Sequence, residues 1–76
     1  MAASKEELEK AIEASEREIE ALEKKRLRSQ SAILEAYVEK TEPDEGDVGY
    51  FKVLTALIKL ERERLRNYKA ELVQLQ

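Results

Sequence analysis

The chain has 76 residues, which is enough for one small domain. Charged residues make up 41% of it, and it contains only two glycines and one proline, a composition that favours helix over sheet. It has no cysteine, histidine or tryptophan, which excludes disulfides, thiol nucleophiles, imidazole bases and zinc-finger ligands. We therefore expect an all-α protein that is not an enzyme and uses no cofactor or metal.

The net charge of −3 conceals four blocks of alternating sign. Residues 1–23 carry −5, residues 24–28 carry +4, residues 35–47 carry −5 and residues 48–76 carry +3. Such blocks act on partner choice and chain orientation rather than on general affinity for polyanions. Since the sequence shows neither a membrane span nor a targeting signal, we expect a soluble protein with no membrane contact, cytoplasmic or otherwise intracellular if natural.

A first helix is predicted over about 4–41. Ser4 and Glu7 form a capping box at its start, and the helix should end before Pro43, which disfavours helical backbone in the preceding residue. A narrow apolar stripe at coiled-coil spacing then runs through Leu8, Ile12, Ile19 and Leu22. From residue 27 onwards the apolar arc is broader.

An acidic loop over 42–46 separates this helix from a second one, predicted over about 47–75. Asp44 and Asp47 are both possible caps, and we favour Asp47 because the apolar run follows it directly. Apolar residues at heptad spacing form one row, Phe51, Leu54, Ile58, Leu65, Leu72 and Leu75. A second row lies beside it and comprises Tyr50, Val53, Leu57 and Leu60.

Two such helices joined by a short loop predict an antiparallel hairpin over residues 1–76. A turn at 44–45 would place Arg26 and Arg28 near Glu61, and the apolar zones 27–38 and 48–60 side by side. Because a lone hairpin has little core, we expect copies to assemble into a four-helix or larger bundle. The residues expected at this interface are Leu27, Leu34, Tyr37, Val38, Tyr50, Phe51, Val53, Leu54, Leu57, Ile58 and Leu60.

Polar residues interrupt the apolar rows at Arg26, Ser29 and Glu61. They are interpreted either as one polar layer that specifies register or oligomer number, or as an ordinary, partly exposed crossing of the stripe. Separately, a group of basic residues could contact phosphates or could pair with neighbouring glutamates: Lys24, Lys25, Arg28, Arg62, Arg64 and Arg66. The net negative charge favours ion pairing, so nucleic acid is not the expected partner.

Two resemblances bear on origin and role. Residues 4–25, with their capping box, Glu–Lys pairs and alanine spacers, resemble the idealised helices of de novo designed bundles. Residues 46–76, with Gly-Asp-Val-Gly-Tyr-Phe-Lys leading into Ile-Lys-Leu-Glu-Arg-Glu-Arg, are similar in style to the oligomerisation hairpin of bacteriophage small terminase subunits. That resemblance implies a hairpin in the wall of a ring, although the DNA-binding helix-turn-helix of that family is missing before it.

The sequence thus favours a homo-oligomer, in which the hairpin serves as an oligomerisation or protein-interaction module, whether natural or engineered. One alternative is a monomeric binder that docks a helix of a partner protein. Another is a DNA-packaging module of the small terminase type.

Overall fold

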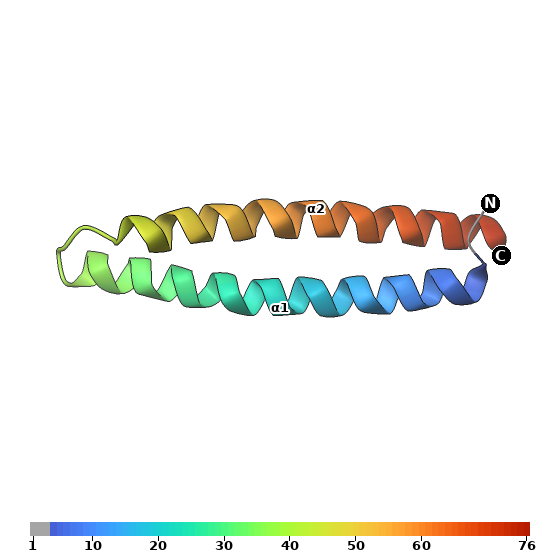
Figure 1. Ribbon diagram of the computed structural model, residues 1–76, viewed down its shortest axis with the longest axis horizontal. Helices are drawn as coiled ribbons and strands as arrows, with labels where there is room; N and C mark the ends of the chain where they lie inside the picture. Colours follow the sequence, from blue (N-terminus) through green and yellow to red (C-terminus); the bar gives the residue numbers. More distant parts are fainter. Residues whose placement is uncertain (1–3) are drawn as a thin grey trace.

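The structure is a computed structural model that describes residues 4–76. Helix α1 (Lys5–Val38) and helix α2 (Glu45–Leu75) lie antiparallel, so that the start of α1 and the end of α2 meet at one end of the molecule (Figure 1). The resulting rod measures 55 × 15 × 15 Å. The predicted all-α, two-helix hairpin is confirmed; the expectations that concern residues 1–3 lie outside the described residues.

Helix α1 begins where the sequence predicts. The Ser4 hydroxyl oxygen accepts a hydrogen bond from the Glu7 backbone N–H at 3.1 Å, which satisfies one of the free donors of the opening turn. Glu6 and Glu7 place negative charge at the positive end of the helix dipole.

The end of α1 was predicted about three residues too late. Lys40 adopts a positive φ of 59°, and its N–H bonds the Tyr37 carbonyl at 3.1 Å. The Thr41 N–H bonds the Ala36 carbonyl at 2.9 Å, which completes a Schellman motif. This closure satisfies the last carbonyls of the helix, so α1 stops at Val38 before the restriction imposed by Pro43 is reached.

The start of α2 was predicted two residues too late, and the preferred cap was wrong. Asp44 is the N-cap, and its Oδ2 accepts a hydrogen bond from the Gly46 N–H at 3.0 Å. A Cβ on residue 46 would lie 2.8 Å from that oxygen, so glycine leaves room for the capping carboxylate. Asp47 instead lies within the first turn, and the loop comprises residues 39–44.

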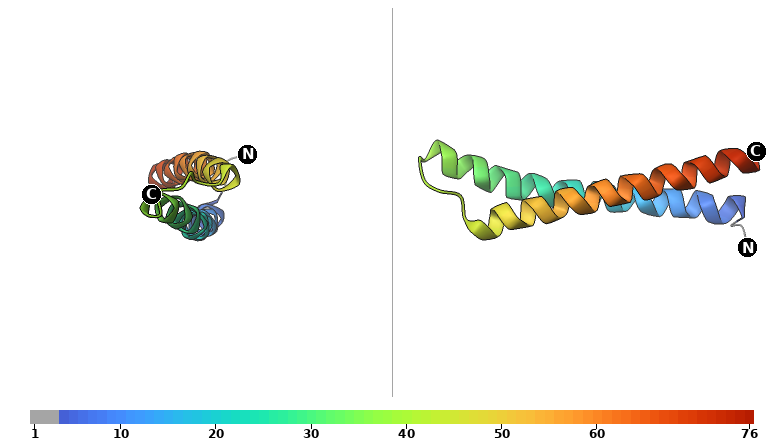
Figure 2. Two further views of the ribbon diagram at one scale, coloured as in Figure 1. Left: turned by 90° about the vertical axis from the view of Figure 1, so that its left-hand side faces the viewer. Right: turned by 90° about the horizontal axis from the view of Figure 1, so that it is seen from above.

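The register of the hairpin also differs from the prediction. Glu61 lies beside Ser15, about three turns away from its expected neighbour Arg26. The loop is centred before residue 44, and the last turn of α1 extends past the start of α2 (Figure 1). Seen from above, the two helices cross and then diverge toward the loop (Figure 2). The apolar zones 27–38 and 48–60 are therefore not directly opposed.

The core is a single seam between the helices. Leu22 packs with Leu54 and Ile58 in its centre, and the remaining buried apolar side chains in residues 4–76 are Leu8 and Ile19. On α1 the seam continues at the same heptad spacing through Arg26, Ser29 and Ile33, rather than shifting to Leu27 and Leu34. The broad apolar arc predicted for α1 consequently faces outward.

The left-handed backbone at Lys40 can be tested by substitution. We expect Lys40→Gly to raise the free energy of unfolding by about 1 kcal/mol, because glycine adopts a positive φ without the steric cost that a Cβ imposes. Chemical denaturation at fixed protein concentration measures the change. Lys40→Ala is the control, since it removes the same charge but keeps the Cβ and should give no such gain.

Candidate functional site

The seam is flanked by two faces, one on each side of the hairpin. At about 100° per residue, Leu27 and Leu34 lie on one side of the α1 seam. Leu27 shares a shallow hollow with Glu20 and Glu23, and Glu23 pairs with Arg62 of α2 at 3.5 Å. This side is the Glu23 face.

The opposite side is the Tyr50 face. Here Lys25, Arg28 and Ser29 of α1 line a hollow together with Asp47 and Tyr50 of α2. The α2 apolar row continues from Tyr50 on this face, because its members recur at intervals of three and four residues: Tyr50, Val53, Leu57 and Leu60.

The two exposed apolar rows therefore occupy opposite faces. On the Tyr50 face the four α2 side chains are 44–62% exposed. On α1 the large apolar side chains that are exposed are Leu27 and Leu34, on the Glu23 face, and Tyr37 and Val38 in the last turn. A single partner surface cannot cover both rows, although the interface predicted from the sequence included both.

Three of the predicted interface residues belong to the hairpin's own seam. Leu54 and Ile58 are only 2% and 1% exposed, because α1 covers them. Phe51 occupies a seam position by its heptad spacing and is half-buried. Leu54 and Ile58 thus stabilise the hairpin itself and are not available to a second chain.

Glu61 makes the most buried polar contact across the seam. The Ser15 hydroxyl, in a side chain that is 3% exposed, donates a hydrogen bond to Glu61 Oε1 at 2.9 Å. The other carboxylate oxygen forms an ion pair with the Arg64 guanidinium at 3.4 Å, and the Glu61 side chain is 15% exposed. Both oxygens of the carboxylate are thus satisfied although it lies in an apolar seam.

The predicted polar layer is not formed as one unit. On α1, Ser29 lies fourteen residues beyond Ser15, which is about 21 Å along the helix. Arg26 lies about three turns beyond Ser15. Glu61 therefore contacts neither of them. Ser15 was missed as its partner, although matching the polar heptad positions of the two helices would have indicated it.

The basic residues are exposed, and ion pairs engage half of them. Lys24 pairs with Glu20 at 3.6 Å, Arg62 with Glu23 at 3.5 Å and Arg64 with Glu61 at 3.4 Å. Lys25 and Arg28 lie on the Tyr50 face, whereas Arg62 and, by helical position, Arg66 lie on the Glu23 face. A continuous phosphate-binding belt would require them to share one face.

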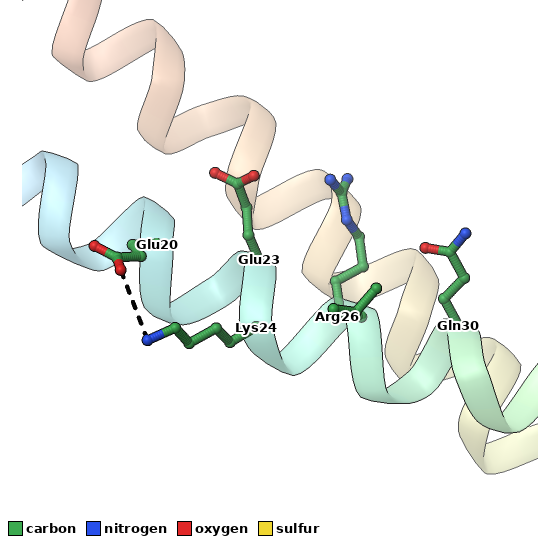
Figure 3. A pocket seen from close by; sticks show the side chains of 6 residues that line it. Glu20, Glu23, Lys24, Arg26 and Gln30 are labelled. Carbon is green, nitrogen blue, oxygen red and sulfur yellow. Dashed lines mark ion pairs between the residues drawn. The ribbon is translucent and has the colours of Figure 1, made fainter.

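The hollows described above, which residues 4–76 line, are open to solvent. Figure 3 shows the one on the Glu23 face, where Glu23, Arg26 and Gln30 extend from α1 without converging on a point. Within residues 4–76, no cluster of acidic side chains is arranged to hold a metal ion. Neither α1 nor α2 has an apolar stretch of the length that crossing a bilayer requires.

No protein-family model, curated protein or solved structure matches the chain. The geometry of the hairpin and the chemistry of its two faces therefore carry the functional argument.

The contact between Ser15 and Glu61 predicts energetic coupling. We expect Ser15→Ala to lower the free energy of unfolding, because it leaves the Glu61 carboxylate without its partner across the seam. In the double variant with Glu61→Leu, the change in this free energy should differ from the sum of the two single changes by a coupling energy of about 1 kcal/mol. Chemical denaturation of the four proteins in the cycle measures this energy.

A second cycle provides the control. Arg26→Leu and Glu61→Leu should be additive within about 0.5 kcal/mol, because the two side chains lie about three turns apart. Additive effects in the Ser15 cycle, or strong coupling in the Arg26 cycle, would contradict the register described above.

Proposed function

We propose that the chain is a non-enzymatic helical hairpin that acts by self-association, as an oligomerisation or protein-interaction module. The observation that carries this proposal is the apolar row of the Tyr50 face, in which Leu57 is 44% exposed and Leu60 is 62% exposed. Contiguous apolar side chains on a surface that is otherwise strongly charged mark sites of protein association. Covering them with the helices of another hairpin would give a bundle.

The exposed area supports association. The chain exposes 6124 Å² to solvent, whereas a compact monomer of 8.8 kDa would expose about 4,800 Å². The excess of about 1,300 Å² exceeds the roughly 800 Å² that each partner buries in a stable interface of ordinary size. Within residues 4–76, the two helices leave this surface uncovered.

A second candidate is a ring or other head-to-tail assembly, and the placement of the two apolar rows on opposite faces favours it. Leu27 and Leu34 of one copy would pack on the Tyr50 face of the next, which is how heterologous contacts close rings. This is the arrangement that the likeness to small terminase hairpins implies. The α1 row is sparser, however, because Gln30 and Ser31 lie between its leucines.

Paired substitutions distinguish association through the Tyr50 face alone from a ring that uses both faces. We expect Leu57→Glu with Leu60→Glu to weaken self-association at least about hundredfold, because two carboxylates would have to be buried in the interface. Sedimentation equilibrium from micromolar to millimolar concentration measures the mass, and circular dichroism checks that the helices persist.

Leu27→Glu with Leu34→Glu is the matched control, since it makes the same change on the Glu23 face. It should leave a dimer intact and disrupt a ring. A wild-type chain that stays monomeric over the whole concentration range would contradict self-association. That result would favour the alternative in which the row binds a helix of a partner protein.

A further inference from the structure

We propose that two copies associate through their Tyr50 faces as an antiparallel dimer, with a two-fold axis that passes near the middle of the apolar row. This inference rests on the proposed self-association and specifies its partner, a second copy of the chain, and its geometry. Three features of the Tyr50 face support it: the span of the apolar row, the order of the charges and the size of the neighbouring α1 residues.

The apolar row is symmetric about its own centre. The row runs from Tyr50 to Leu60. A two-fold axis that lies in the interface near residue 55, perpendicular to the long axis of the rod, therefore places the whole row over its copy in the opposite direction. Tyr50 of one chain then lies over Leu60 of the other, and Val53 over Leu57. A parallel arrangement about the long axis would instead place this row over α1 of the copy, where Lys25 and Arg28 lie level with Tyr50.

The charges on α1 match this arrangement. Lys25 and Arg28 lie at the Tyr50 end of the row, in a hollow with Asp47 of α2. Glu18 lies at the other end of the same face, in a hollow with Glu61 and its ion-pair partner Arg64. The part of α1 that lies level with residue 55 of α2 falls between Glu18 and Lys25. The two-fold axis therefore brings Lys25 and Arg28 of each copy toward Glu18 of the other, and this contact occurs twice.

The apolar residues that α1 contributes to this face are small. Ala11 and Ala14 line the hollow that contains Glu18, and Ala21 lies on the same face at the level of the apolar row. Small side chains allow helices to approach closely, so α1 of one copy can pass over α1 of the other without separating the two apolar rows. The large apolar residues of the face are therefore on α2, and its small apolar residues are on α1.

A charge-reversal experiment tests the contact. We expect Lys25→Glu with Arg28→Glu to weaken dimerisation about tenfold or more, because symmetry converts two attractive contacts into two repulsive ones. Adding Glu18→Lys should restore the dissociation constant to within about threefold of the wild-type value. Sedimentation equilibrium at low salt measures all three proteins, and circular dichroism confirms that each is helical.

Lys52→Glu with Lys59→Glu is the control, because it makes the same change in charge in the loop half of the rod, on the opposite side of the α2 seam from the apolar row. It should leave dimerisation within about threefold of wild type. A dimer that the Lys25 and Arg28 reversal leaves unchanged, or that Glu18→Lys does not restore, would overturn the proposed contact.

The orientation is tested by distance. The chain has no cysteine, so Glu42→Cys allows one spin label to be attached in the loop of each copy. In the antiparallel dimer the two labels should lie about 40 Å apart, since each lies more than ten residues from the two-fold axis. Labels closer than about 25 Å would overturn the antiparallel geometry.

Different results would overturn the proposed dimer geometry and the proposed self-association. A parallel dimer or a ring overturns the two-fold arrangement on the Tyr50 face but leaves self-association standing. A wild-type chain that remains monomeric overturns both.

Discussion

The rest of the structure depends on a limit of two-helix packing: each helix can bury only the side chains that face the other. In this hairpin the buried set is one seam, with Leu22, Leu54 and Ile58 at its centre. Apolar residues more than about 90° from that seam on either helix stay in solvent however well the hairpin folds. The exposed row from Tyr50 to Leu60 is a direct consequence, and it is the reason to place the function of the chain on an outer face.

The seam is also unusually polar for so small a core. Ser15 and Ser29 are buried in it on α1, and Glu61 enters it from α2. The Glu61 carboxylate, whose side chain is only 15% exposed, requires partners. Arg64 of the same helix supplies one in any register, whereas the hydrogen-bonded pair with Ser15 of α1 forms at one level of the rod only. This pair therefore favours the observed register over those shifted by one or two turns, at some cost in stability relative to an apolar seam. The surface ion pairs contribute less, because water screens them.

Much of the secondary structure followed from local signals. Ser4 and Glu7 indicated the start of α1 because capping depends on residues only three apart, and heptad spacing indicated the α2 seam from Phe51 to Leu72. The helix ends near the loop were misplaced by two or three residues. Lys40 carries no sequence signal for a left-handed backbone, and the choice between Asp44 and Asp47 depended on how the chain leaves the first helix.

The sequence by itself determined that the chain is helical, that it reverses once and which residues of α2 face inward, because propensity, capping and periodicity act over one or two turns. The register and the separation of the apolar rows onto opposite faces depended on the tertiary structure. Both features arise from the path of residues 39–44 and from the divergence of the helices near the loop. They depend on contacts between residues more than forty positions apart in the sequence. A periodic pattern shows which residues share a side of one helix, whereas the relation between two helices exists only once they are packed.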